Sequence, residues 1–422
     1  SDLTLDTGVG DDVVNFGSGN DTFKISKDYL GNDTVDGGAG IDTFHVAFSS
    51  TGRTPITFKG TTLFQNTPLV ALIDANNSVA LTNFEKIISA GGADTFTGGY
   101  AATGLQSIDM GGGDDVFGWL TFSGHALDID AGRGNDTVNI GGNTGSGRTG
   151  LIDGTVAGGM GLDTLKLGVT NGNDGATGFK VVIEDDAASR DSIKGSVQYA
   201  DGASAIETGP KVDFTGFEAL TFFNANNAGL ASTNSDYVDA TATSRSLSLD
   251  TGIGNDTVNF GRGNDTFAVS NTKFGVDVVD GGAGIDTFHV NFSSTTRAPI
   301  TFKGTNFNDN TPLVAELDAN NKVTLTNFEV IKSAGGADTF TGGYASRALT
   351  DIDMGGGDDT FEWFTFLNDK LNIDAGRGND TVKIGGDFSG TKTGLFDGHV
   401  DGGMGNDTLA FRFTEGGKGT GF

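Results

Sequence analysis

Aspartates at regular intervals are the residues of this chain most suited to chemistry. Each follows a glycine by two places and precedes an apolar residue by two places, as Asp42 does in VDGGAGIDTFHV at 35–46. Glycine permits positive φ and a close approach of the backbone, so carbonyl oxygens can turn inward beside the carboxylate. Such oxygen ligands suit Ca²⁺, which accepts about six to eight at loose geometry, whereas Mg²⁺ requires a stricter octahedron. The candidate metal ligands are Asp12, Asp21, Asp33, Asp42, Asp94, Asp115, Asp136, Asp163, Asp256, Asp265, Asp277, Asp286, Asp338, Asp359, Asp380 and Asp407.

The second half of this set repeats the first. Asp36 recurs as Asp280, 244 residues further along, and the same offset holds without a gap from about residue 5 to residue 165. The apolar residue two places after each candidate aspartate is identical in both copies, as a shared interior would require. We therefore divide the chain into a first repeat at 1–244, with motif blocks at about 5–46 and 90–168 and a β-rich remainder at 179–244, and a second, truncated repeat at 245–422.

A shorter period runs inside each copy. The steps between Asp12, Asp21, Asp33 and Asp42 are 9, 12 and 9 residues, so each aspartate lies 21 residues before the next but one. Asp94 and the two motif aspartates that follow it are separated by that offset as well. This spacing predicts a coil of about 21 residues, in which each circuit returns a loop beside the previous one. The fold class predicted is all-β, with parallel β-roll or β-solenoid blocks interrupted by extra β segments and duplicated in tandem.

Two stacked loops could supply enough oxygens for one cation. We expect about eight or more Ca²⁺ sites, because four pairs one coil apart occur in each copy. The alternative is a glycine-turn β-solenoid without metal, but stacked carboxylates repel one another unless a cation lies between them. The expected pairs in the first copy are Asp12 with Asp33, Asp21 with Asp42, Asp94 with Asp115, and Asp115 with Asp136.

These units resemble the repeats-in-toxin (RTX) family, whose Gly-Gly-x-Gly-x-Asp-x-U-x nonapeptides (U, apolar) form parallel β-rolls filled with Ca²⁺. The matching segments are FGSGNDTFK, GGAGIDTFH, MGGGDDVFG, AGRGNDTVN and GGMGNDTLA. The resemblance covers about a third of the chain, and the 12-residue steps and long gaps depart from the tandem family pattern. It implies secretion by a type I exporter and an extracellular or bacterial cell-surface location.

Composition restricts the partners. The net charge is −29 and the pI about 4.2, so nucleic acid is an unfavourable partner, because binding a polyanion requires a basic surface. Cysteine is absent, which excludes disulfides and thiolate metal sites. No apolar run is long enough to predict a membrane span. The chain begins at Ser1 without a methionine, and we expect it to be part of a longer protein.

Several segments lack the motif. Glu85, Glu218 and Glu329 follow a phenylalanine in strand-like surroundings, and we expect them to pair with neighbouring backbone, with a ligand role as the alternative. Asp236 has no glycines before it, and it is interpreted as marking a coil that kept the fold and lost the ion. The segment 74–85 has EF-hand-like spacing but no glycine at the required turn, so we expect a strand, a turn and a strand.

The function predicted from these features is a calcium-rigidified repeat region of a large surface or matrix protein, an adhesin stalk or surface-layer subunit. Duplication favours this interpretation, since arrays extend reach while an enzyme gains little from a second copy. Neighbouring copies of the chain or a surface or host glycan are possible partners. We expect no enzyme activity, because no nucleophile and base occur in a recognisable order. The alternatives are the calcium-binding tail of a secreted protease, lipase or epimerase, and a sugar- or ice-binding module.

Overall fold

The chain consists of β-strands arranged in two compact units. Within the described residues every regular element is a strand and none is a helix, which confirms the predicted all-β class. The units are Ser1–Asp201 with Ile206–Leu230, and Gly202–Ala205 with Ala231–Phe422. This division follows packing, whereas the boundary at 244/245 follows sequence repetition. The computed structural model describes residues 1–47, 54–62, 68–143, 150–170, 178–188, 191–201, 206–223, 235–292, 298–306, 312–386 and 394–413.

Parts of the two predicted repeats lie outside the described residues. In the first repeat these are 48–53, 63–67, 144–149, 171–177, 189–190, 202–205 and 224–234, and in the second they are 293–297, 307–311, 387–393 and 414–422.

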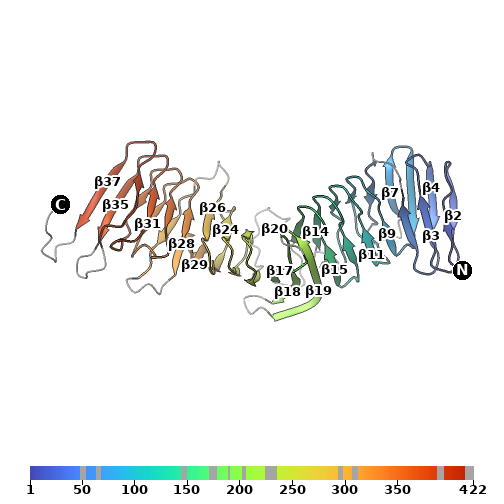
Figure 1. Cartoon of the computed structure of the whole chain (residues 1–422), viewed down its shortest axis with the longest axis horizontal. Helices are drawn as coiled ribbons and strands as arrows, with labels where there is room; N and C mark the ends of the chain where they lie inside the picture. Colours follow the sequence, from blue (N-terminus) through green and yellow to red (C-terminus); the bar gives the residue numbers. More distant parts are fainter. Residues whose placement is uncertain are drawn as a thin grey trace. The chain divides into compact units, whose positions relative to one another are not determined.

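Two sheets face each other in unit 1 and enclose its core (Figure 1). In the first sheet the neighbouring strands are, in order, β1 (Thr4–Leu5), β3 (Thr22–Ile25), β5 (Thr43–Val46), β9 (Lys86–Ile88), β11 (Ser107–Asp109), β13 (Asp128–Asp130), β15 (Gly154–Ala157), β19 (Ile206–Phe217), β18 (Ile193–Asp201) and β17 (Gly178–Asp185). In the second they are β2 (Val13–Asn15), β4 (Asn32–Asp36), β8 (Asn77–Thr82), β7 (Leu69–Asp74), β6 (Thr57–Lys59), β10 (Thr95–Thr97), β12 (Val116–Phe117), β14 (Thr137–Asn143), β16 (Thr164–Thr170) and β20 (Ala219–Phe223).

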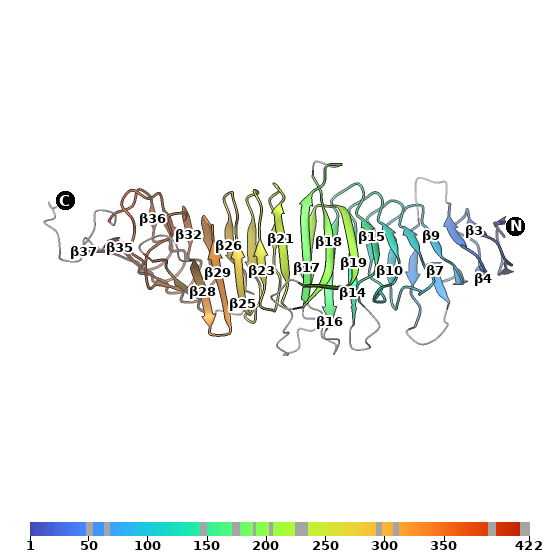
Figure 2. The ribbon, with the colours of Figure 1, turned by 90° about the horizontal axis from the view of Figure 1, so that it is seen from below.

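Unit 2 repeats this arrangement, and Figure 2 shows its strands β21, β23 and β25 side by side. The first sheet runs β21 (Tyr237–Ala242), β23 (Thr257–Asn259), β25 (Val276–Asp280), β29 (Asn321–Thr326), β28 (Leu313–Asp318), β27 (Thr301–Lys303), β31 (Thr339–Thr341), β33 (Thr360–Phe361), β35 (Thr381–Gly386) and β37 (Thr408–Phe413). The second runs β22 (Ser248–Leu249), β24 (Thr266–Val269), β26 (Thr287–Val290), β30 (Val330–Lys332), β32 (Asp351–Asp353), β34 (Asn372–Asp374) and β36 (Val400–Asp401).

The register of the parallel strands confirms the predicted coil. Phe23 of β3 pairs with Phe44 of β5, and Phe96 of β10 pairs with Phe117 of β12, so each strand lies beside its equivalent in the next circuit of the chain. Strands β14 and β16 also pair in parallel, but with a longer stretch of chain between them, as Thr137 opposite Thr164. A coil therefore tolerates extra residues between strands while its sheet register is kept.

The extra β segments are antiparallel insertions within otherwise parallel sheets. Strands β8, β7 and β6 pair antiparallel and lie between β4 and β10, and β29, β28 and β27 do the same in unit 2. The predicted strand, turn and strand at 74–85 is confirmed, since β7 ends at Asp74 and β8 begins at Asn77. A third antiparallel set, β17, β18 and β19, is present in unit 1.

The apolar residue that follows a motif aspartate lies in the interior between the sheets, except for Leu409 of the last described strand, which is 49% exposed. Phe23, Phe44 and Phe96 are fully buried, and Phe96 stacks on Phe58 with ring centroids 4.4 Å apart. Trp119 is also buried, and its indole N–H donates to the Phe58 carbonyl oxygen at 3.1 Å. The packing of these side chains fixes the register between each motif loop and the loop of the next coil.

Candidate metal centre

The structure brings the predicted aspartates together in rows along the edges of the sheets. In each row the backbone N–H of one aspartate donates to Oδ1 of the aspartate one coil further along, at 2.6–3.0 Å. We call these sets carboxylate rows. They are Asp12 and Asp33; Asp21, Asp42 and Glu85; Asp94, Asp115, Asp136, Asp163 and Glu218; Asp236, Asp256 and Asp277; Asp265, Asp286 and Glu329; and Asp338, Asp359, Asp380 and Asp407.

All four pairs expected in each copy lie in register, and the rows extend further than the spacing predicts. The backbone N–H of Asp136 donates to Oδ1 of Asp163 at 2.8 Å, although the two residues are 27 positions apart. The shorter coil period does not predict this pair. The backbone N–H of Asp236 donates to Oδ1 of Asp256 at 2.8 Å. Asp236 therefore belongs to a row although no glycines precede it. The sequence does contain a pattern that indicates the pair of Asp136 and Asp163, because both aspartates belong to matching Gly-x-Gly-x-Asp units.

The glycines allow neighbouring loops to stack at backbone contact distance. Gly38 has φ +88°, and a Cβ on it would lie 2.3 Å from the carbonyl oxygen of Gly17 in the preceding coil. Gly134 has φ +137°, and its Cβ would lie 1.8 Å from the carbonyl oxygen of Gly113. No side chain fits at such distances. The glycines were expected to let the backbone come close to a cation. In the structure they also let the backbone of one loop come close to the backbone of the next.

A second ladder of side chains runs beside the rows in the opposite direction. The residue before each motif aspartate is often asparagine, and its Oδ1 accepts the backbone N–H of the following coil. Asn20 accepts from Ile41 at 3.0 Å and Asn135 accepts from Leu162 at 2.9 Å. These asparagines therefore join successive coils in addition to occupying the turn.

One oxygen of most row aspartates is buried without a hydrogen-bond partner. Oδ1 is used by the row, but Oδ2 contacts neither donor nor solvent, although the side chains of Asp42, Asp115 and Asp163 are at most 1% exposed. Burying an ionised carboxylate without a compensating group is strongly unfavourable. Among the described residues this holds for Oδ2 of Asp12, Asp33, Asp42, Asp115, Asp136, Asp163, Asp256, Asp265, Asp286, Asp359 and Asp380.

Burial also perturbs the protonation of these groups. Removal from water raises the pKa of Asp115 to about 8, and the neighbouring carboxylates Asp94 and Asp136 raise it further against the lowering effect of its backbone hydrogen bond. Burial likewise raises the pKa of Asp359, the equivalent residue in the second copy, to about 8, and that of Asp163 to about 7. A divalent cation beside Oδ2 would compensate this cost without protonation.

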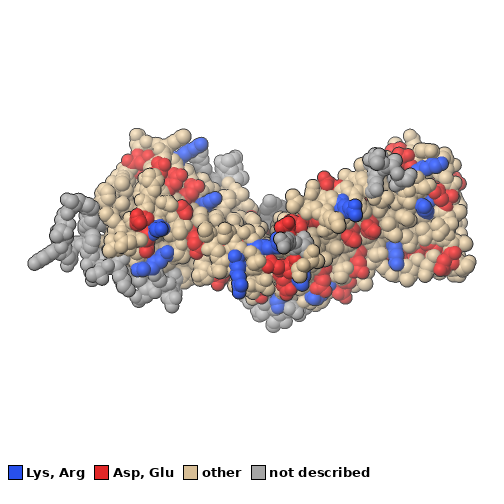
Figure 3. Space-filling model, in the orientation of Figure 1, with Lys and Arg blue, Asp and Glu red and all other residues tan. Residues whose placement is uncertain are grey.

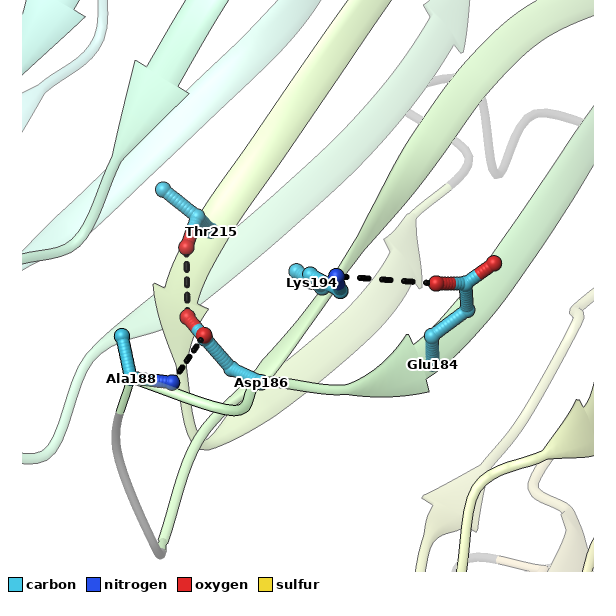
Figure 4. Close-up of polar contacts among 5 residues, drawn as sticks. All are labelled: Glu184, Asp186, Ala188, Lys194 and Thr215. Carbon is cyan, nitrogen blue, oxygen red and sulfur yellow. Dashed lines mark hydrogen bonds and ion pairs between the residues drawn. The ribbon is translucent and has the colours of Figure 1, made fainter.

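Asp186 provides the contrast within the same chain. It lies in the antiparallel insertion, where Oδ2 accepts the Thr215 hydroxyl at 2.5 Å and Oδ1 accepts the Ala188 N–H at 2.9 Å (Figure 4). The Thr215 hydroxyl, followed by the Ala188 N–H, lowers the pKa of Asp186. Asp186 is much less buried than the row aspartates, so its hydrogen bonds outweigh desolvation and its pKa shifts in the opposite direction to theirs.

The residues fit Ca²⁺ by the chemistry of their donors, with most ligands to come from the backbone. Within the described parts of the chain, no three His, Cys, Asp or Glu side chains form a preformed metal cluster. Two carboxylates from adjacent coils, with the carbonyl oxygens of glycine loops, are the oxygen donors available. Oxygen-only donors of this kind favour Ca²⁺ over the transition metals.

Two coils satisfy the buried oxygen in another way. The Ser89 hydroxyl donates to Oδ2 of Asp94, and the Ser333 hydroxyl donates to Oδ2 of Asp338. Each serine occupies the first position of its loop, where Gly37 stands in the loop of Asp42. The sequence carried this signal, because the serine recurs in both copies. Asp94 and Asp338 therefore begin their rows with Oδ2 already hydrogen-bonded.

We expect Ser333→Ala to lower the free energy of unfolding of unit 2 by about 1–3 kcal/mol, because the buried Oδ2 of Asp338 loses this donor. Urea unfolding followed by the fluorescence of buried Trp363 measures the change. Ser270→Ala is the matched control, since Ser270 donates to Oδ2 of Asp250 at an exposed position. Equal effects of the two substitutions would contradict the assigned role of Ser333.

The described residues contain no helix long and apolar enough to cross a membrane. A cavity of about 400 Å³ lies in unit 2 beside Phe328 and Arg347, and its lining holds no carboxylate or imidazole. Comparison with models of known protein families and with curated proteins finds no match.

Proposed function

We propose that this chain is a calcium-dependent structural repeat region of a large extracellular bacterial surface or matrix protein, of the kind found in adhesin stalks or surface-layer subunits. The buried, unpartnered Oδ2 atoms of the carboxylate rows carry the proposal. Four of them recur at equivalent places in the two copies, as Asp12 and Asp256, Asp42 and Asp286, Asp115 and Asp359, and Asp136 and Asp380, so they are a repeated feature of the coil. The resemblance of the loops to RTX repeats supports the same cation and an extracellular location.

Calcium would act on the folded form. Ca²⁺ sites of extracellular modules have dissociation constants of about 10⁻⁴–10⁻³ M, so such sites stay empty in the cytosol and fill outside the cell. A ligand that binds only the folded state adds about 2.7 kcal/mol per site at a hundredfold excess over its dissociation constant. Several such sites would outweigh the self-repulsion of a chain with a net charge of −29.

Surface chemistry favours an array over the alternatives. On the face shown in Figure 3, basic side chains are scattered among acidic ones and form no continuous basic surface, which disfavours nucleic acid. Outward threonines form an aligned file in unit 2, from Thr301 through Thr339, Thr360 and Thr381 to Thr408. The neighbouring outward positions carry Lys303 and the ion pair of Lys383 with Glu362. Charges beside the file make a flat ice-binding face the less favoured function.

Calorimetric titration of the calcium-depleted chain tests the proposal. We expect about eight or more Ca²⁺ ions per chain with dissociation constants of about 10⁻⁴–10⁻³ M, and weaker binding of Mg²⁺. Failure to bind Ca²⁺ would overturn the proposal. Equal binding of the two cations would contradict the assignment of Ca²⁺ to the rows.

A further inference from the structure

Three glutamates end carboxylate rows within the same local sequence. Glu85 and Glu329 follow Asn-Phe, and Glu218 follows Gly-Phe. The phenylalanine is buried in each case, which anchors the glutamate beside the sheet edge. The residue two places before the glutamate is left-handed, with φ 55° at Asn83, 55° at Asn327 and 74° at Gly216.

Each glutamate takes the place that an aspartate of the next coil holds elsewhere in a row. Oε2 of Glu85 accepts the backbone N–H of Asp42 at 2.7 Å. The corresponding distances are 2.8 Å from Asp286 to Glu329 and 2.6 Å from Asp163 to Glu218. The expected pairing of these glutamates with backbone is confirmed. This pairing places a carboxylate on the far side of the last motif loop.

The left-handed residue directs its carbonyl oxygen into the same space. A Cβ on Gly37 would lie 2.2 Å from the carbonyl oxygen of Asn83 and 2.9 Å from Oδ2 of Asp42. Both oxygens therefore face the room that the missing side chain of Gly37 leaves. Oδ2 of Asp42 has no hydrogen-bond partner there, and the side chain of Asp42 is fully buried.

The same convergence occurs at the other two row ends. A Cβ on Gly281 would lie 2.1 Å from the carbonyl oxygen of Asn327 and 3.0 Å from Oδ2 of Asp286. A Cβ on Gly158 would lie 2.2 Å from the carbonyl oxygen of Gly216 and 3.0 Å from Oδ2 of Asp163. In both cases Oδ2 is buried without a partner.

We propose that Glu85, Glu218 and Glu329 each complete a terminal Ca²⁺ site together with Oδ2 of the preceding row aspartate and the carbonyl oxygen of the left-handed residue. The inference rests on the proposed function, because it concerns the same rows, and it adds sites where no second Gly-x-Gly-x-Asp loop is present. Three oxygens from two coils, two of them from carboxylates, suit a hard cation. The serine-bearing coils mark the contrast, since there a hydroxyl occupies the position beside Oδ2.

The test counts Ca²⁺ bound to the full chain by equilibrium dialysis at millimolar Ca²⁺ with metal analysis. Glu85→Gln, Glu218→Gln and Glu329→Gln keep an Oε oxygen that can accept the aspartate N–H, but remove the charge. We expect each single variant to bind one Ca²⁺ fewer than the wild type and the triple variant three fewer. Three separate row ends keep the test open if one variant fails to fold.

Glu184→Gln is the control variant. Glu184 forms an exposed ion pair with Lys194 at 3.7 Å, outside any row (Figure 4), so its replacement changes net charge equally and should leave the count unchanged. A wild type that binds no Ca²⁺ would refute the proposed function itself. A wild type that binds Ca²⁺ while the folded glutamine variants keep the full count would overturn only the terminal sites.

Discussion

Calcium depletion near neutral pH is expected to abolish most of the β-sheet circular dichroism of this chain, and addition of Ca²⁺ is expected to restore it cooperatively. Adjacent carboxylates such as Asp115 and Asp136 are buried one coil apart, and Oδ2 of each lacks a partner. Without a cation, ionised forms of these groups oppose folding through both lost hydration and mutual repulsion. Because each coil packs on the next, loss of several sites should unfold many coils together.

Far-UV circular dichroism and the emission of buried Trp119 and Trp363 measure this transition, since each copy holds one of the two tryptophans. Mg²⁺ at the same concentration is the control cation and should restore little structure. A calcium-depleted chain with an unchanged β signal and unchanged unfolding temperature would contradict the switch.

The calcium-depleted chain is expected to become more stable as the pH falls from about 8 to about 4. The raised pKa values of about 8 at Asp115 and Asp359 and about 7 at Asp163 exceed the value of about 3.9 for an unfolded aspartate. The folded chain therefore binds more protons than the unfolded chain in this range. Its stability contribution from these groups is complete below about pH 4 and is lost as the pH rises through the folded-state values.

Far-UV circular dichroism of protein depleted on a chelating resin measures the folded fraction across that range, and thermal unfolding measures the stability at the pH values where the chain is folded. Replacement of Asp115 and Asp359 by asparagine should flatten the curve, because both groups then remain uncharged. With saturating Ca²⁺ the trend should reverse at acid pH, where protons compete with the cation for the carboxylates. Greater stability of the depleted chain at pH 8 than at pH 5 would contradict the assignment.

The coil and its rows could be predicted from sequence because one spacing determines both. Identical interior side chains one coil period apart, such as Phe23 and Phe44, fix the parallel register and thereby align Asp21 with Asp42. The extension from Asp136 to Asp163 was missed, since the longer connection between them breaks the period while the sheet keeps its register.

The remaining features depend on side-chain direction, which spacing does not encode. Glu85 joins a row only because left-handed Asn83 turns the chain at the right place. Ser333 satisfies Asp338 only because the two lie on the same loop, with the hydroxyl facing Oδ2. The glutamate and the serine each recur at the equivalent position of the second copy. The duplication therefore indicates that these positions matter, but it does not predict which atoms they contact.

The serine-bearing coils would give the rows that follow them a direction of assembly under the proposed function. Because the Ser89 hydroxyl donates to Oδ2 of Asp94, this coil has its buried oxygen paired before any ion arrives. Each later step, from Asp94 to Asp115 and on to Asp136, adds a loop whose Oδ2 has no such donor. If the rows bind Ca²⁺ as proposed, we expect nucleation to be least unfavourable at the serine-bearing coil and the row to grow from there toward its far end as ions bind.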